Sequence, residues 1–332
     1  MKTTLKRIVG SAAGLAAGAS LLIGTHAAAD EYPSKPITIV APYSAGGDSD
    51  LAARNLASTA AQYIGQPILV VNRTGASGVT GSAFVKNAKP DGYTLLLARV
   101  GSQAVIPALQ PTIPYKWNDF TFLGLLELNP YVCAVKADSP YKTMQDLVDA
   151  IKKNPGKLSY STAGVGTIHQ MGPQMLFSSL KLSKDAATQV PFKGGGEAST
   201  AVLGGHVDFG CSNLATVVNY IRAGQMRALM VTTPERYAEL KDVPTARELG
   251  YPDMEQITGW SALYGPPGMD QAIVDKWAKA LAEVAKDKSW LKLTTQLGSV
   301  PQIRSPADTA KWAQSQFETY DKLGRELGLR KE

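Results

Sequence analysis

The chain has 332 residues, of which 44% are hydrophobic and 19% charged, and its formal net charge is +6. This length suits two domains of about 150 residues, each with its own core. It contains no Lys/Arg block, no basic stripe interleaved with aromatic residues, no CxxC spacing and only three histidines, so nucleic acid, a zinc site and a cofactor are not expected.

The first 29 residues have the pattern of a secretory signal peptide. Three basic residues precede the apolar run Ile8–Ile23, and the small residues Ala27–Ala29 suit a cut before Asp30. A retained membrane anchor is the alternative. Cleavage leaves 303 residues, and losing the three basic residues lowers the net charge from +6 to +3. We therefore expect a soluble, exported protein, and the leader fits a bacterial periplasm.

The first βα unit predicts an anion site. Ile37–Ala41 is typical of a buried strand, Pro42–Gly47 of a loop, and a helix is expected from Asp48 to about Tyr63. The first N–H groups of a helix lack intrahelical acceptors, and the macrodipole makes that end positive. An ordinary turn with Asp48 as N-cap is the alternative. The loop is not a Walker loop, because no Gly-Lys-Ser/Thr follows.

The next segments point to the same edge of a sheet. A strand is expected at Pro67–Val71, followed by the Gly-rich loop Asn72–Gly81, a helix at about Thr80–Asn87 and a strand at Tyr93–Ala98, with Arg99 at its end. This alternation predicts βαβ units and a parallel sheet, whose ligands bind beyond the carboxyl ends of the strands. The sequence therefore favours a small anionic ligand.

A second α/β domain is expected after a break at Asn129-Pro130. Ser161–His169 repeats the order of strand end, small-residue loop and helix, and Val190–Gly196 again leads from a strand into a Gly-rich turn. Gly259–Pro266 is predicted to cross back to the first domain. We assign 30–130 and 260–300 to domain 1, and 131–259 and 301–332 to domain 2. A ligand held between the domains would be buried by hinge closure.

The two cysteines, Cys133 and Cys211, both lie in apolar, strand-like runs. An oxidising compartment permits a disulfide, but bridging needs Cα atoms within about 7 Å. The sequence leaves both a disulfide and two buried free thiols open.

The order of short motifs resembles the Bug-type (TctC-like) substrate-binding proteins of tripartite tricarboxylate transporters. The similarity spans nearly the whole mature chain, and its strength lies in the order of motifs that are weak singly. The motifs are Y-P-S-K-P-I (Tyr32–Ile37), P-Y-S-A-G-G (Pro42–Gly47), N-R-T-G-A-S-G (Asn72–Gly78), P-D-G-Y-T-L-L-L (Pro90–Leu97), A-G-V-G-T-I-H (Ala163–His169), V-P-F-K-G-G-G (Val190–Gly196), L-G-G-H-V-D (Leu203–Asp208), R-A-L (Arg227–Leu229), V-P-T-A-R-E-L-G (Val243–Gly250), and the Trp260 strand with G-P-P-G (Gly265–Gly268).

This resemblance implies a periplasmic receptor with a two-domain Venus-flytrap fold, which captures a carboxylate and passes it to a membrane permease. A monomer without enzymatic activity is expected. The resemblance places one carboxylate on backbone N–H groups, hydroxyls and waters between the domains. The implied ligand-binding residues are Tyr43, Ser44, Ala45, Gly46, Ala76, Ser77, Gly78, Gly164, Gly166, Thr167, His169 and, at the floor of the site, Asp208.

Two residues depart from the family pattern. Asp48 replaces a small polar residue, and it either caps the helix or reads a cationic group on the ligand. Arg99 replaces a small or hydroxyl residue, and it is either solvated or forms a fork for a second carboxylate. The second reading of Arg99 favours a dicarboxylate, aliphatic or aromatic.

Two rival functions remain from the sequence. A secreted enzyme is disfavoured, because no G-x-S-x-G motif occurs and the mature chain holds only His169 and His206 as imidazole bases. His169 is therefore read as an orienting hydrogen-bond donor. A receptor that presents its ligand to a membrane sensor kinase would have the same fold and pocket, so the sequence does not separate it from an uptake receptor.

Overall fold

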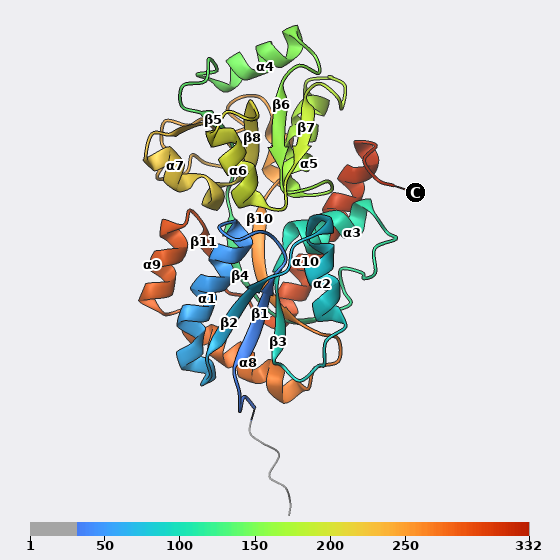
Figure 1. Cartoon of the computed structure of the whole chain (residues 1–332), viewed down its shortest axis with the longest axis vertical. Coiled ribbons are helices and arrows are strands. Elements are labelled where there is room, and N and C mark those ends of the chain that lie inside the picture. The colour runs from blue at the N-terminus through green and yellow to red at the C-terminus, as the bar shows by residue number, and fades with distance from the viewer. Residues whose placement is uncertain (1–31, 332) are drawn as a thin grey trace, which may run out of the picture. The chain divides into compact units, whose positions relative to one another are not determined.

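The computed structural model describes residues 32–331, so the predicted signal peptide lies outside the described residues. The described chain folds around two sheets (Figure 1), and we call the sheets with their covering helices the first and second lobes. This confirms the predicted α/β class with two domains. Within residues 32–331, no helix combines the length and apolar character that a membrane span requires.

The first lobe has a mixed sheet with the strand order β11-β4-β10-β3-β1-β2. β1 pairs in parallel with β2 and β3, whereas β10 runs antiparallel to β3 and β4. The carboxyl ends of β1 and β3 therefore share one edge, as predicted. The strands are β1 (Ile37–Ala41), β2 (Ile68–Asn72), β3 (Thr94–Arg99), β4 (Thr121–Asn129), β10 (Gly259–Gly265) and β11 (Val300–Pro301).

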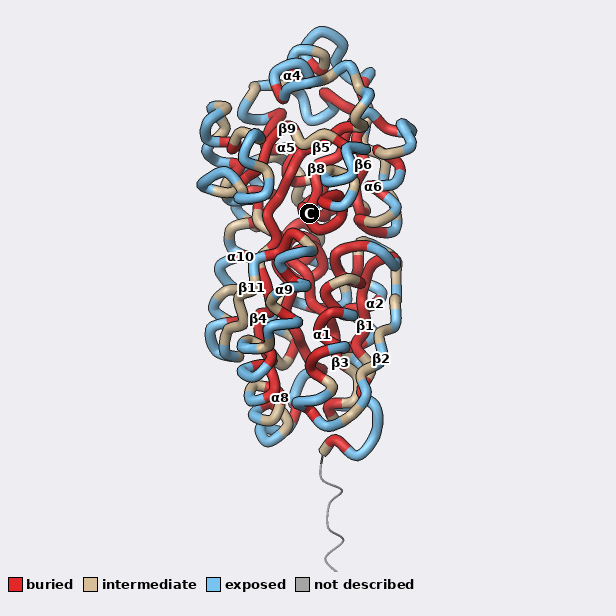
Figure 2. The backbone as a smooth tube through the Cα atoms, turned by 90° about the vertical axis from the view of Figure 1, so that its left-hand side faces the viewer, coloured by how far each residue is buried: buried red, intermediate tan, exposed pale blue. Residues whose placement is uncertain are grey.

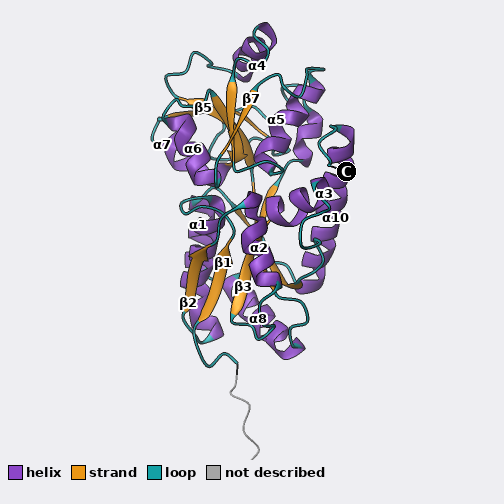
Figure 3. Cartoon of the chain, turned by 45° about the vertical axis from the view of Figure 1, so that its right-hand side comes forward, coloured by secondary structure: helices purple, strands orange, loops and turns teal. Residues whose placement is uncertain are grey.

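Alternating side chains bury both faces of this sheet. Ile37, Ile39 and Ala41 belong to one apolar cluster with residues of α1 and α8, while Val40 belongs to the cluster on the other face. Helices surround the sheet in Figure 3. The helices of this lobe are α1 (Asp48–Ile64), α2 (Val79–Lys86), α3 (Ile106–Leu109), α8 (Gln271–Val284), α9 (Lys288–Gln296) and α10 (Pro306–Glu326), with the short helical turns η1 (Ala76–Gly78) and η2 (Gly101–Val105).

The second lobe repeats this design with the strand order β7-β6-β8-β5-β9. Val132 and Ala134 of β5 face one apolar cluster, and Cys133 and Val135 face another. Figure 2 shows the resulting buried centre of each lobe. The elements are β5 (Tyr131–Lys136), α4 (Met144–Lys153), β6 (Ser159–Thr162), α5 (Ile168–Ser179), β7 (Thr188–Pro191), α6 (Gly195–Leu203), β8 (Phe209–Asn213), η3 (Leu214–Thr216), α7 (Val218–Arg222), β9 (Met226–Val231) and η4 (Pro252–Gln256).

The C-terminal segment differs from its expected place in domain 2. Helix α10 packs on β4 and α3 of the first lobe. The Leu125 N–H donates to Thr309 Oγ1 at 2.6 Å, and the Lys331 N–H donates to the Leu109 carbonyl at 2.8 Å. The assignment of 301–332 to domain 2 was therefore wrong, because the apolar side of α10 covers a face of the first sheet.

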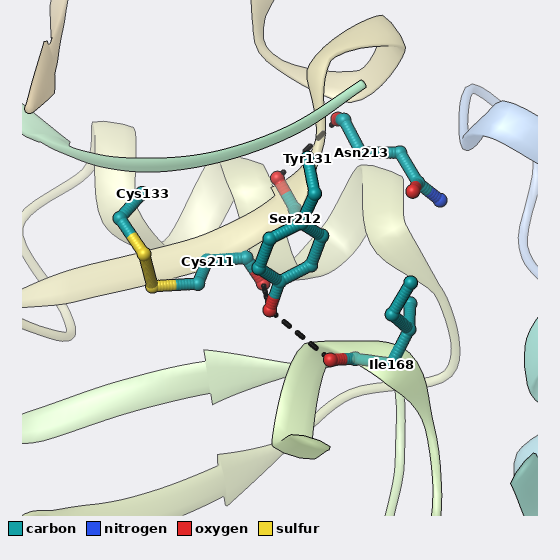
Figure 4. The surroundings of a disulfide bond; sticks show 6 residues. All are labelled: Tyr131, Cys133, Ile168, Cys211, Ser212 and Asn213. Carbon is teal, nitrogen blue, oxygen red and sulfur yellow. Dashed lines mark hydrogen bonds between the residues drawn. A yellow bond between two sulfur atoms is a disulfide. The ribbon is translucent and has the colours of Figure 1, made fainter. Parts of the chain in front are cut away.

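Cys133 and Cys211 form a disulfide between the neighbouring strands β5 and β8 (Figure 4). Their Cα atoms lie 4.0 Å apart, and both residues are fully buried. Tyr131, two residues before Cys133, donates its hydroxyl to the carbonyls of Cys211 at 2.9 Å and Ile168 at 3.0 Å. The bridge therefore joins two strands of the sheet to which the start of α5 is attached.

Removing this bridge with Cys133→Ala and Cys211→Ala should lower the free energy of unfolding by roughly 4 kcal/mol. The disulfide closes a loop between residues 78 positions apart, and without it the unfolded chain gains conformational entropy. Urea unfolding at pH 7 measures the change. Wild-type protein unfolded in excess dithiothreitol is the control and should approach the stability of the double variant. Equal stability of the oxidised wild type and the double variant would contradict the prediction.

Candidate functional site

A small cavity of about 20 Å³ lies where the two lobes meet. Both lobes contribute to its wall, as the clamp prediction requires. The lining residues are Tyr43, Asp48, Arg99, Val100 and Gly101 from the first lobe, and Ala163, Thr167, Ile168, His169, Gly195 and Asn213 from the second.

Several helix starts converge on this cavity. Asp48 begins α1, Gly101 begins η2, Ile168 begins α5 and Gly195 begins α6, and all of them line the wall. The first-turn N–H groups of a helix have no intrahelical acceptor, and the helix dipole adds partial positive charge there. The backbone alone therefore makes the cavity a favourable place for an anion.

A buried ion pair forms part of the wall. Arg99 Nη2 lies 2.5 Å from Asp48 Oδ2, and Asn213 of the second lobe donates its amide N–H to the same oxygen. Arg99 Nη1 donates to Ser261 Oγ and lies 3.9 Å from Glu127 Oε1. The guanidinium therefore sits between two buried carboxylates.

Burial and neighbouring charges shift the pKa values of the ionisable groups at the cavity. Burial alone would raise the pKa of Asp48, but the Arg99 guanidinium, His169 and the Asn213 amide outweigh it and hold the pKa below its usual range. Burial raises the pKa of Glu127, against the opposing effect of Arg99. Burial also lowers the pKa of His169 to about 4. At neutral pH the cavity therefore faces one cation, one carboxylate and a neutral imidazole.

His169 is placed as a hydrogen-bond donor. Its Nδ1 accepts the Ala163 N–H at 3.0 Å, so the neutral ring carries its proton on Nε2. Nε2 is buried and has no hydrogen-bond partner among the described residues. This N–H supplies a donor that a ligand oxygen would satisfy.

The lobes meet through backbone contacts at glycines. A Cβ added to Gly196 would lie 3.0 Å from the Ala45 carbonyl oxygen, and one added to Gly194 would lie 2.6 Å from the Ser44 nitrogen. On the other side of the cavity, Ser77 Oγ donates to the Val165 carbonyl of the second lobe. These contacts need positions without side chains, which explains the Gly-rich loops on both lobes.

The residues proposed from the sequence fall into different places. Tyr43, Arg99, Thr167 and His169 line the cavity. A second group lies in the loops that flank it. These residues are Ser44, Ala45, Gly46, Ala76, Ser77, Gly78, Gly164 and Gly166. Which of these residues contact a ligand stays a prediction.

Two expectations about acidic residues are corrected. Asp208 is exposed and does not line the cavity, because its carboxylate accepts the Ser159 N–H at 2.7 Å and the Ser159 hydroxyl at 2.9 Å. Asp48 is not the N-cap of α1. Gly47 holds that position, and Asp48 Oδ1 accepts the N–H of Ser49 at 2.9 Å.

Sequence reasoning missed Asn213, Gly195 and Gly101 as cavity residues. Asn213 ends β8, Gly195 starts α6 and Gly101 follows Arg99. All three lie at or just beyond the carboxyl edge of a sheet. The rule that ligands bind there could have been applied to every strand end in both lobes. In the described part of the chain, no cluster of His, Cys, Asp and Glu has the arrangement of a metal site.

Comparisons with known proteins agree with this architecture. The model of the "Tripartite tricarboxylate transporter family receptor" family matches residues 52–329. A UPF0065 protein from the TAR-I ttuE-ttuC' intergenic region of Agrobacterium vitis is 36% identical, over 93% of this chain and 89% of that protein. The periplasmic binding protein BugD is 30% identical with a TM-score of 0.86, covering 91% of this chain and all of BugD.

A further similar structure contains a ligand. MatC from Rhodopseudomonas palustris, solved with bound malate, is 30% identical to this chain with a TM-score of 0.83. The match covers 88% of this chain and 99% of MatC.

Proposed function

This chain belongs to the receptor family of the tripartite tricarboxylate transporters, and from that membership we propose that it captures a small carboxylate between its lobes and delivers it to the membrane permease of such a transporter. The family consists of periplasmic solute-binding receptors and not of enzymes. We further propose that the leader at 1–29 is cleaved on export, that the receptor acts as a monomer and that it catalyses no reaction.

The observation that carries this proposal is the convergence of helix starts around one cavity. The starts of α5 and α6 face the start of η2 from the other lobe, and His169 adds an N–H without a partner among the described residues. A carboxylate accepts several such N–H donors at once, and each charge-assisted bond stabilises it more than a neutral one does. Bound malate in MatC supports a carboxylate as the ligand class.

The finer preference for a dicarboxylate depends on Arg99. MatC's malate carries two carboxylates, which supports this preference. In this chain, however, both ends of the guanidinium already have acceptors. Nη2 of Arg99 donates to Asp48, and Nη1 of Arg99 donates to Ser261. A second ligand carboxylate would have to compete with Asp48 for the guanidinium.

A thermal-shift screen of the purified protein tests the proposal. Mono-, di- and tricarboxylates and amino acids are compared with sugars as controls. A ligand at 100 times its Kd should stabilise the native state by about 2.7 kcal/mol, which raises the melting temperature. The proposal fails if neither a carboxylate nor an amino acid raises the melting temperature. Transfer to the permease is then tested by uptake of the labelled ligand into proteoliposomes that contain the permease, with and without the receptor.

A further inference from the structure

The carboxylate of Asp48 lines the cavity, and the binding of a plain carboxylate would not use it. Asp48 Oδ2 accepts from both Arg99 and Asn213, whereas Oδ1 accepts the Ser49 N–H alone among the described residues. An ionised carboxylate oxygen has capacity for a second donor. A Cβ placed on Gly195 would lie 3.8 Å from Oδ1, so this oxygen lies close to the start of α6 in the second lobe, at the wall of the cavity.

The side-chain charges of the cavity do not complement a dianion. Arg99 is the cation in the lining and Asp48 the carboxylate, while His169 is neutral above its lowered pKa. Glu127 lies behind Arg99 and adds no positive charge. The side chains therefore sum to zero, and the helix starts supply favourable partial charge for one ligand carboxylate.

We infer that Asp48 selects a ligand in which one carboxylate is joined to a cationic amino group, so that an amino acid binds between the lobes more tightly than its analogue without the amino group. The ligand carboxylate would accept from the start of α5 and from His169 Nε2, and its ammonium would donate to Asp48 Oδ1. This inference rests on the proposed function as a carboxylate receptor.

The alternative role of Asp48 is to neutralise Arg99 and nothing more. The two roles predict opposite effects for Asp48→Asn. If Asp48 reads an ammonium, the variant loses affinity for amino acids. If Asp48 only neutralises Arg99, the variant frees the guanidinium and strengthens binding of a dicarboxylate, without a specific loss for amino acids.

The test compares matched ligand pairs by isothermal titration calorimetry at pH 7. The pairs are alanine with propionate, aspartate with succinate, and glutamate with glutarate. For the wild type, we expect the amino member of the best-bound pair to bind at least 10-fold more tightly. Asp48→Asn should reduce this ratio by about 10- to 100-fold, because a charge-assisted hydrogen bond is replaced by a neutral one.

Asp149→Asn makes the same substitution on the exposed surface of α4 and should leave the ratio unchanged. Melting curves of all variants verify folding, and the wild-type comparison does not depend on any variant. Tighter binding of the members without an amino group to the wild type would overturn the inference while leaving the proposed function intact, as would an unchanged ratio in folded Asp48→Asn. Absence of binding by every carboxylate and amino acid would overturn both.

Discussion

Replacing Arg99 by methionine is expected to lower the free energy of unfolding by about 3–5 kcal/mol at pH 7. Methionine keeps much of the side-chain volume but removes the cation that lies 2.5 Å from Asp48 and 3.9 Å from Glu127. Both carboxylates are almost fully buried. The loss is large because the variant leaves buried negative charge without its partner, and it is not a measure of what the intact pair contributes.

Urea unfolding of the wild type and Arg99→Met measures this change. The double variant Asp48→Asn with Arg99→Met is the matched control, because it removes the cation and one of its carboxylates together. We expect the double variant to be more stable than Arg99→Met alone. Equal stability of the two, or a loss below about 1 kcal/mol in Arg99→Met, would show that the carboxylates do not depend on the guanidinium.

The pH dependence of this effect follows from the signs of the two pKa shifts. The pKa of Asp48 is lowered in the native state, so its contribution is present above the unfolded value of about 3.9 and is lost as the pH falls through the native value. The pKa of Glu127 is raised, so its contribution is present at low pH and is lost as the pH rises through the native value. Removing Arg99 raises the pKa values of both carboxyl groups, so more of each group is protonated and uncharged at pH 5 than at pH 7. Arg99→Met should therefore be less destabilised at pH 5 than at pH 7.

The cluster also connects the site to the frame of both lobes. Arg99 ends β3, Ser261 lies on β10 and Glu127 on β4, and these strands are neighbours in the first sheet. Asn213 brings β8 of the second lobe to the same carboxylate of Asp48. A change in the ion pair between Arg99 and Asp48 therefore affects both the core of the first lobe and the contact between the lobes.

Much of the local structure followed from the sequence because it depends on local patterns. The strand Ile37–Ala41 and the helix beginning at Asp48 are where the apolar run and the Gly-rich loop placed them. Arg99 ends its strand as expected. The helical segment directly after Arg99 was missed because its five residues are all buried and have no exposed polar face. Helix α9 was missed because its nine residues are too short for a clear amphipathic pattern.

The partnerships across the site could not be predicted in this way. Arg99 and Asp48 are 51 residues apart, and Asn213 and Asp48 are 165 apart. Their meeting depends on strand register and on how the lobes contact each other, which no local pattern encodes. The misplacement of Asp208 has the same origin, because Asp208 lies in the bend directly before β8, whereas Asn213 ends that strand at the cavity edge.

Replacing Gly194 by alanine is expected to weaken ligand binding by about 100-fold without unfolding the protein. Gly194 has an extended backbone with φ of 178°, which alanine adopts without strain. Its new Cβ would instead lie 2.6 Å from the backbone nitrogen of Ser44 in the first lobe. The clash therefore acts on the contact between the lobes and not on the second lobe itself.

The expected loss of affinity follows from the hydrogen bonds that the ligand loses when the lobes are held apart. If the start of α5 and His169 move away from the start of η2, a ligand carboxylate loses charge-assisted hydrogen bonds from one side. Two such bonds account for about 3 kcal/mol or more, which is at least about 100-fold in Kd.

Calorimetry with the best carboxylate from the thermal-shift screen measures the affinity. Small-angle X-ray scattering of the saturated protein measures whether the lobes stay further apart than in the wild type. Gly204→Ala is the matched control on the same lobe, because its added Cβ meets the exposed ring of His206 and atoms of its own helix end. Wild-type affinity in a folded Gly194→Ala variant would mean that ligand binding does not require the lobe contact at Ser44. The clamp would then have to act through the remaining contacts between the lobes, at Ala45, Asp48 and Ser77.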